Sequence, residues 1–335
     1  MLDLKKKLRI EVSENCSGII LNEDDILSVK EKHYYVIPVT LDGDAPKEFI
    51  KLYHYCEDSG VKKVNTNTWD SYIAKAAEKW YPHESVVEYM INRIGQVLDL
   101  RMNETALFKI NTQIRFLSKY FLKKNEILIH GAEICGSYLN DNAFAELIAN
   151  NLKESRALFT FEFLTNAIKY TFPDNYNEIL NDLVRLITFD ALTGNNDRHF
   201  YNWGIITNTK KDKQVPKFAP IYDSARGLFW NESDDNIKII KKNLKSNNKF
   251  ETYLKNACPR ISVEGNSKIN HFGLIDYLKN NNEHYKLIIE EIASVENEKN
   301  VYNMLNKEFL RFFISERNEL ILLLLKERFK KVRGE

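Results

Sequence analysis

Short clusters of hydrophobic residues alternate with polar breaks along the first third of the chain. Two of these clusters, Gly18–Leu21 and His33–Val39, have the length and composition of β-strands. Tyr72–Lys75 predicts a further strand that ends in a lysine, and Gln113–Leu122 predicts another. We therefore expect an antiparallel, strand-rich N-terminal lobe over residues 1–122.

A helical spacing of hydrophobic residues interrupts this pattern once, from Glu84 to Leu100. The residues that recur three or four positions apart are Val87, Met90, Ile91, Ile94 and Val97. Gly95 lies within the pattern and is tolerated there. The sequence therefore places one helix directly after the strand that ends at Lys75.

Beyond residue 122 the spacing is mainly helical. Helices are expected at Phe144–Ala157, Phe161–Tyr170, Tyr176–Thr193, and near 272–295 and 299–331. Two short strands, Trp203–Ile206 and Phe218–Tyr222, separate the third helix from the rest. The prediction is an α+β, two-lobed, protein-kinase-like fold with a mainly helical C-terminal lobe over residues 123–335.

Charge and composition narrow the classes of function. The chain has 48 Lys plus Arg and 47 Asp plus Glu, which gives a net charge of +1. Proteins that bind nucleic acid by themselves are usually strongly basic, so we expect no direct binding of nucleic acid. Hydrophobic residues make up 44% of the chain, which is enough for a folded core.

The expected location is the cytoplasm. The four cysteines of the chain form no C-x-x-C pair, and the N-terminus lacks the apolar stretch of a secretory signal. The most apolar run, Leu320–Leu325, is far shorter than the roughly 20 residues that span a membrane, so no span is expected. Secretion as an effector without a signal peptide stays open.

Candidate chemistry begins at the loop after the third helix, where Asp197 and Asn202 have the spacing D-x-x-x-x-N. In phosphoryl transfer, such an acid accepts the proton of the attacking hydroxyl, and the amide oxygen holds Mg²⁺ against the phosphates. The same spacing at Asp190/Asn195 and Asp276/Asn281 falls on ordinary helical positions. Spacing alone is therefore a weak signal.

Two further elements strengthen the interpretation. Asp223 ends an apolar strand about twenty residues after the loop, where a kinase-like fold supplies its second magnesium carboxylate, although a turn-capping role explains it as well. Lys75 precedes Glu88 by thirteen residues, as in the lysine–glutamate pair that orients ATP phosphates. Glu84 is a competing partner, and we favour Glu88 because it lies deeper in the apolar pattern.

Together these residues resemble the active-site core of HipA-like serine/threonine kinases, in particular the compact CtkA-type members. The segments that carry the resemblance are Asn196–Gly204 and Ala219–Asp223, with weaker similarity at Asp58–Lys63 and at Leu128–Glu133. The resemblance covers residues 59–227. It implies an ATP- and Mg²⁺-dependent protein kinase capable of autophosphorylation, acting as a toxin or effector.

The resemblance also assigns site residues. It implies Asp197 as the catalytic acid/base, Asn202 and Asp223 as magnesium ligands, and His199 as structural support for the loop. The residues that it implies around ATP are Ser59, Gly60 and Lys63 in the phosphate loop, Lys75 and Glu88 at the phosphates, and the backbone of Lys119, Tyr120 and Phe121 near adenine. The predicted phosphate loop lacks the glutamine common in the family, and Ser59 in this loop is a candidate autophosphorylation site.

Other functions remain open. Asp197-Arg198-His199 followed by Asn202 also resembles the catalytic loop of phosphatidylinositol 3/4-kinases, which makes a lipid kinase the alternative. A catalytically inactive pseudokinase that binds a partner is a second alternative. A protein substrate is favoured, because neither a lipidation signal nor a strongly basic amphipathic helix is found. A helix-turn-helix antitoxin is a possible partner.

Overall fold

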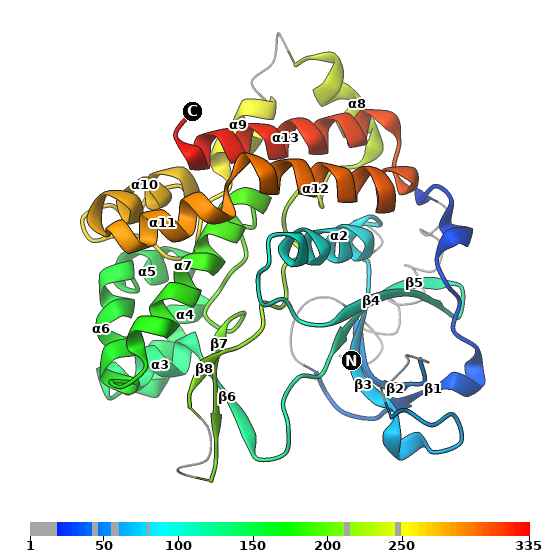
Figure 1. Ribbon diagram of the computed structural model, residues 1–335, viewed down its shortest axis with the longest axis horizontal. Helices are drawn as coiled ribbons and strands as arrows, with labels where there is room; N and C mark the ends of the chain where they lie inside the picture. Colours follow the sequence, from blue (N-terminus) through cyan, green and yellow to red (C-terminus); the bar gives the residue numbers. More distant parts are fainter. Residues whose placement is uncertain (1–18, 42–45, 55–59, 79–80, 211–214, 245–248) are drawn as a thin grey trace.

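The computed structural model describes residues 19–41, 46–54, 60–78, 81–210, 215–244 and 249–335. Figure 1 shows two parts, a twisted sheet formed by the N-terminal strands and a larger helical body formed by the rest of the chain. No helix in the described ranges is long and apolar enough to cross a membrane.

The N-terminal sheet has five strands, all paired antiparallel, in the order β1-β2-β3-β5-β4. The strands are β1 (Tyr34–Ile37), β2 (Lys47–Leu52), β3 (Asp70–Ala76), β4 (Thr105–Ile110) and β5 (Gln113–Lys119). Side chains alternate between the two faces of a strand. On β3, Ala74 is buried in a small core with Ile50 and Leu117, so its neighbour Lys75 faces the opposite side of the sheet.

That opposite side is covered by helix α2 (Glu84–Val97), which packs on β4 and β5. Ten residues of α2 are buried, because the helix lies between the sheet and the C-terminal helix α12 (Val295–Glu308). Arg93 of α2 donates two hydrogen bonds of 3.0 Å to the carboxylate of Glu308. Sheet, α2 and C-terminal body are therefore packed together.

The C-terminal part combines a small antiparallel sheet with a helical body. The sheet has the order β6-β7-β8 and contains β6 (Glu126–His130), β7 (Gly204–Asn208) and β8 (Lys217–Phe218). The other helices are α3 (Gly131–Leu139), α4 (Asn142–Asn150), α5 (Leu152–Leu158), α6 (Phe161–Thr171), α7 (Tyr176–Thr193), α8 (Asp234–Lys242), α9 (Lys249–Asn256), α10 (His271–Asn281), α11 (Glu283–Ile292) and α13 (Ser315–Arg333). Helix α7 packs against α6, α10, α11 and α13 and forms the centre of this body.

Several predicted elements are confirmed. Helix α7 has the predicted bounds, since its apolar stripe is continuous and Gly194 ends it. The helix predicted from Glu84 is α2, and the strand predicted at Tyr72–Lys75 lies within β3. Residues 122 and 123 lie in the connection between β5 and β6, and the lobe boundary that we place there stays a prediction. Strands β2, β4 and β6 and helices α3, α8 and α9 were not predicted.

Five predicted elements differ from the structure. The helix predicted near 272–295 is divided into α10 and α11, because the Asn282 side chain caps the amides of His284 and Tyr285. The helix predicted near 299–331 is divided into α12 and α13 by the 3₁₀ helix η5 (Leu310–Phe312).

The cluster at Gly18–Leu21 forms no strand in its described residues, because buried Ile20 packs into the C-terminal core and the amide of Leu21 donates to the carbonyl of Phe312. The single helix predicted at Phe144–Ala157 is divided into α4 and α5. Asn151 causes the division, because its side chain caps the amides of Lys153 and Glu154.

The strand predicted at Phe218–Tyr222 is also shorter than expected. Only Phe218 of that segment belongs to β8. The chain then leaves the small sheet, and Ile221 instead hydrogen-bonds to the backbone of Arg101 and Asn103, on the connection between α2 and β4. This departure brings Asp223 toward the N-terminal sheet and α2.

Candidate active site

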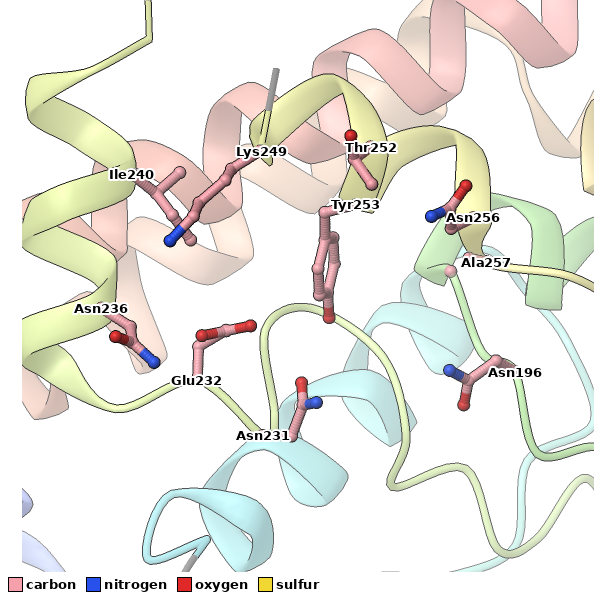
Figure 2. Close-up of a pocket in the computed structure, with 11 residues that line it drawn as sticks. Asn196, Asn231, Glu232, Asn236, Ile240, Lys249, Thr252, Tyr253, Asn256 and Ala257 are labelled. Carbon is pink, nitrogen blue, oxygen red and sulfur yellow. The ribbon is translucent and has the colours of Figure 1, made fainter. Parts of the chain in front are cut away.

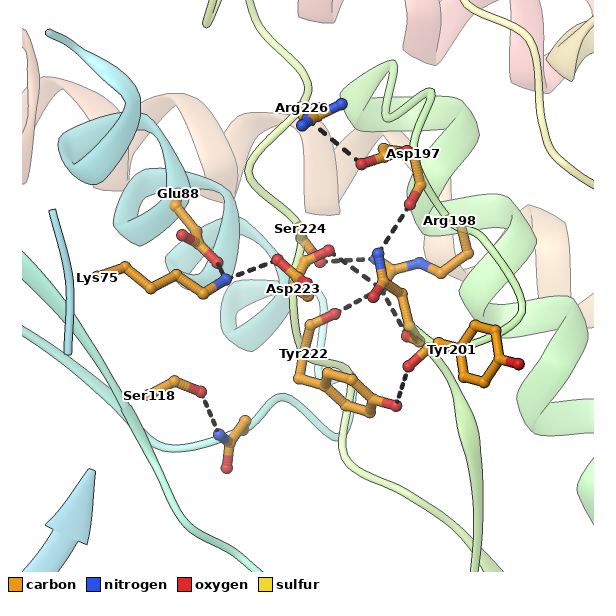
Figure 3. A network of polar contacts seen from close by, with 12 residues as sticks. Lys75, Glu88, Ser118, Asp197, Arg198, Tyr201, Tyr222, Asp223, Ser224 and Arg226 are labelled. Carbon is orange, nitrogen blue, oxygen red and sulfur yellow. Dashed lines mark hydrogen bonds and ion pairs between the residues drawn. The ribbon is translucent and has the colours of Figure 1, made fainter. Parts of the chain in front are cut away.

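Lys75 of β3 makes a charged contact between the two lobes. Its Nζ lies 2.8 Å from Oε1 of Glu88 on α2 and 2.6 Å from Oδ1 of Asp223, which follows β8. Figure 3 shows the three side chains converging from three different elements. The preference for Glu88 over Glu84 as the partner of Lys75 agrees with this geometry.

The environment favours the charged forms of Lys75 and Asp223, whereas burial raises the pKa of Glu88. Burial opposes the charge on Lys75, but Asp223 and Glu88 outweigh it and raise the pKa of Lys75 above its ordinary value. Burial also opposes the charge on Asp223, yet the Lys75 ammonium holds the pKa of Asp223 below its ordinary value. Asp223 has a left-handed backbone with φ of 53°, a strained conformation of the kind found at functional sites.

The loop that carries Asp197 begins where α7 ends. Gly194 ends the helix with φ of 72°, a conformation that favours glycine. Asn195 then fixes the turn, because its Nδ2 donates to Oδ1 of Asp190 at 3.0 Å and its Oδ1 accepts from the amide of Asp197 at 3.1 Å. The position of Asp197 is therefore set by a side chain buried within α7.

Arg198 joins this loop to the segment that contains Asp223. Its Nε and Nη2 each donate to one carboxylate oxygen of Asp190 at 3.0 Å. The same guanidinium donates to the carbonyls of Asn202 and Tyr222 and to Oγ of Ser224, as Figure 3 shows for Tyr222 and Ser224. The buried Arg198 side chain thus fixes the Asp197 loop relative to the segment that contains Asp223.

Asn202 and Asp223 fit a hard cation such as Mg²⁺. Nδ2 of Asn202 donates to the carbonyl of Asp197 at 2.9 Å, which orients the amide and leaves its Oδ1 as a free acceptor among the described residues. Asp223 uses Oδ1 for Lys75, and its side chain keeps 39% of its surface exposed. An amide oxygen and an ionised carboxylate are donors that Mg²⁺ prefers.

The Asp197 carboxylate pairs with two arginines, Arg226 and Arg260. Nη2 of Arg260 donates to its Oδ1 at 2.8 Å, and Nε of Arg226 lies 3.3 Å from its Oδ2. The Arg226 guanidinium also stacks over the Trp230 ring, with 5.2 Å to the ring centroid. Each carboxylate oxygen of Asp197 therefore has a cationic partner.

The segment after β5 offers backbone groups rather than side chains. The amides of Lys119 and Tyr120 donate to the carbonyls of Glu104 and Ser71, and the Lys119 ammonium pairs with the Glu104 carboxylate at 2.8 Å. In the part of the chain that the structure describes, the amide of Phe121 has no hydrogen-bond partner. Of the three residues predicted near adenine, Phe121 therefore offers the available donor.

The predicted phosphate loop is described only in part. Ser59 lies outside the described residues. Gly60 has φ of 68°, and Lys63 is exposed in the turn before the 3₁₀ helix η4 (Thr66–Thr68). No hydrogen bond or ion pair among the described residues joins Gly60 or Lys63 to Lys75, so their contact with ATP stays a prediction.

His199 lies within the loop as a supporting residue. Its Nδ1 accepts from the amide of Tyr201 at 3.3 Å, and its backbone bonds to both Asp197 and Asn202. Burial lowers the pKa of His199. Because Nδ1 is already used as an acceptor within the loop, His199 fits a role in supporting the loop.

Sequence reasoning missed four residues of this site: Asp190, Arg198, Arg226 and Arg260. Asp190 was interpreted as an ordinary helical position, although it continues the apolar stripe of α7 three residues after Ile187. A carboxylate on a buried stripe indicates a buried cationic partner, and that signal was available in the sequence. Arg260 lies far from the motifs in sequence and gave no such signal.

Glu84 provides a prediction about pH. It is 8% exposed, and burial together with the charge of Glu88 raises the pKa of Glu84 from 4.5 to about 7. Between these values the folded state binds a proton that the unfolded state releases, so its contribution to stability is lost as pH rises through 7. We expect Glu84→Gln to raise the free energy of unfolding by roughly 1–3 kcal/mol at pH 8 and to change it little at pH 4.5.

Urea unfolding at both pH values measures this effect. Glu290→Gln, at an exposed position of α11, is the matched control and should change stability little at either pH. An equal increase in the free energy of unfolding of Glu84→Gln at both pH values would contradict the raised pKa of Glu84.

Comparisons with known proteins identify the family and the fold. A sequence model of the family described as HipA-like C-terminal domain matches residues 39–298, a range that contains Lys75, Asp197, Asn202 and Asp223. No curated protein matches the chain.

Solved structures of other proteins are also similar to this chain. The Helicobacter pylori proinflammatory kinase CtkA aligns with a TM-score of 0.70 and 17% identity over 92% of this chain and 96% of that chain. HipA of Shewanella oneidensis MR-1, from a toxin–antitoxin complex with HipB and operator DNA, aligns with a TM-score of 0.46 and 10% identity over 90% of this chain and 66% of that chain. The likeness to CtkA confirms the α+β, kinase-like fold. Because the family match spans most of its length, the chain belongs to the family of HipA-like C-terminal domains.

Proposed function

We propose that this protein is an ATP- and Mg²⁺-dependent kinase that phosphorylates serine or threonine in a protein substrate. The observation that carries the proposal is the convergence of Glu88, Lys75 and Asp223, with ion-pair distances of 2.8 and 2.6 Å at Nζ of Lys75. In protein kinases a strand lysine paired with a helix glutamate contacts the ATP phosphates, and a nearby aspartate binds the metal.

The described residues supply the other parts of the reaction. Asp197 would accept the proton of the substrate hydroxyl as oxygen attacks the γ-phosphorus, and its loop position is fixed through Asn195. Lys75 would neutralise phosphate charge, and the Phe121 amide would donate to the adenine ring. Mg²⁺, when bound by Asn202 and Asp223, supplies charge neutralisation of the phosphates.

Transfer of labelled γ-phosphate tests the proposal. Wild type, incubated with Mg²⁺ and ATP, is expected to label itself and proteins in a cell lysate on serine or threonine. Asp223→Ala should abolish the label, because Lys75 would lose one partner and the metal would lose its carboxylate. Omission of the divalent cation should have the same effect on wild type.

Other outcomes would overturn the proposal. Label in phosphatidylinositol but not in protein would identify a lipid kinase. No transfer to any acceptor, with ATP binding intact, would identify a pseudokinase. Label that persists in Asp223→Ala would exclude the proposed metal site.

Finer features of the function are proposed on the family resemblance. Ser59 is the proposed autophosphorylation site, and retention of all mapped phosphorylation sites in Ser59→Ala would count against it. A helix-turn-helix partner and a role as a toxin or effector are proposed on the same basis. Co-purification from the native cell tests the partner, and growth after induced expression tests toxicity.

A further inference from the structure

The catalytic loop borders a cavity that has Asp197 in its lining. This cavity has a volume of about 560 Å³ and is lined by segments from α5, the Asp197 loop, the Arg226 segment and residues 256–268. Its charged lining residues are Arg156, Arg226, Arg260, Lys268 and Asp197, four cations and a single carboxylate. The excess of positive charge lies directly beside the proposed acceptor site.

The arginines of this cavity are held in place by the fold. Arg156 is buried and donates to the carbonyls of Pro259, Ser267 and Ile269, which fixes the segment that carries Arg260 and Lys268. Such fixed guanidinium groups are pre-organised for binding a carboxylate or phosphate, because little conformational entropy is lost on contact.

Two cationic groups retain capacity for an anion. Nε of Arg260 is buried and has no hydrogen-bond partner, and Lys268 is exposed with no ion pair to its ammonium among the described residues. An unpaired buried donor is costly unless a ligand or water satisfies it. An anionic group in the cavity would contact the exposed Lys268 ammonium and the accessible part of the Arg260 guanidinium, whose side chain is 20% exposed.

The adjoining cavity differs in charge. It has a volume of about 510 Å³, shares Asn196 and Asn256 with the first, and is lined mainly by amides and hydroxyls. Figure 2 shows its one carboxylate, Glu232, and its one ammonium, Lys249, on the side away from Asn196. The surface around Asp197 is thus a groove with one strongly cationic half and one balanced half.

We propose that the cationic half binds an acidic side chain next to the acceptor residue of the protein substrate, either Asp/Glu or phosphoserine. The inference deepens the proposed kinase function and rests on it. The substrate anion draws Arg260 and Arg226 from Asp197, whose carboxylate then accepts the hydroxyl proton. Only a substrate that carries this anion releases the base, so recognition and activation are coupled.

A peptide array tests the proposal. Serine-acceptor peptides carry Asp, Glu, phosphoserine, Ala or Lys at each flanking position in turn, and the rate of phosphate transfer is measured for each. Wild type is expected to prefer acidic over lysine flanks at one or more positions by roughly tenfold or more. The Asp and phosphoserine arms show which anion the cavity takes.

Three variants sharpen the test. Lys268→Glu should reduce or reverse the ratio of acidic to lysine-flanked transfer, and Arg260→Met should reduce it. Lys299→Glu, the same charge reversal at an exposed position of α12, should keep the ratio of wild type. Equal loss for all peptides in Arg260→Met would assign that arginine to the transition state and overturn the proposal.

A binding measurement separates this inference from the kinase proposal. Fluorescent peptides with alanine in place of the acceptor serine need no catalysis, and their anisotropy should show weaker binding of the acidic peptide to Lys268→Glu. Transfer without any acidic preference would overturn the inference and leave the kinase standing. No transfer, but binding of acidic peptide that depends on Lys268, would overturn the kinase alone. Single-stranded RNA bound through Lys268, without acidic-peptide preference, would assign the cavity to nucleic acid and overturn the inference.

Discussion

Asp197→Asn is expected to lower the rate of phosphate transfer by about 10²–10⁴-fold, the contribution typical of a general base. The amide has the same shape as the carboxylate but cannot accept the proton of the substrate hydroxyl. ATP binding should be retained, because Lys75, Glu88 and Asp223 form a separate cluster that the change leaves intact. Single-turnover transfer and the shift of melting temperature with ATP measure the two effects.

The matched control is Asp235→Asn, at an exposed position at the start of α8. This variant should keep the wild-type rate. An Asp197→Asn enzyme that keeps its rate within a few-fold would exclude Asp197 as the base. Loss of both transfer and ATP binding would indicate that the change disturbs the whole cleft, through its contacts with Arg226 and Arg260.

Arg198→Met is expected to destabilise the fold by about 3–5 kcal/mol, because it leaves the buried Asp190 carboxylate without its cation. Arg198 is 3% and Asp190 is 3% exposed, so water cannot replace the lost partner. The melting temperature of a chain of this length should fall by roughly 5 °C or more. Differential scanning calorimetry measures the change.

Two comparisons make this expectation specific. Arg185→Met removes the arginine of a partly exposed ion pair with Asp182 and should cost only about 0–1 kcal/mol. The double variant Arg198→Met with Asp190→Leu removes both buried charges and should be more stable than Arg198→Met alone. A double variant that is less stable would show that the hydrogen bond from Asn195 to Asp190 contributes more to the fold than the two buried charges cost.

Much of the fold followed from periodicity. Helix α7 was predicted with its bounds because eighteen residues with an apolar stripe end at a glycine suited to the left-handed cap. Strand β3 and helix α2 were predicted for the same reason, since each pattern is local. Strands β2, β4 and β6 were missed, because their half-buried side chains mix polar and apolar residues and only the neighbouring strand explains them.

The candidate site was predictable where its residues lie in short motifs. Asp197, Asn202 and Asp223 were identified from spacing and resemblance, and Lys75 and Glu88 from a strand followed by a helix. Their catalytic roles stay predictions that the variants above test. Arg226 and Arg260 were not identified, because nothing in the sequence around residue 260 indicates that it reaches Asp197, 63 residues earlier.

The sequence by itself determined the secondary structure that has a strong period, the strand-rich and helical halves, and the identity of the residues suited to phosphate chemistry. These properties depend on residues within a few positions of one another, so they can be predicted from the sequence. Only the tertiary structure decided that Lys75 contacts Glu88 and Asp223 together, that Arg198 is anchored on Asp190, and that two arginines hold Asp197. The reason is physical: ion pairs and buried hydrogen bonds depend on distance and exclusion of water, and both arise only when distant segments pack.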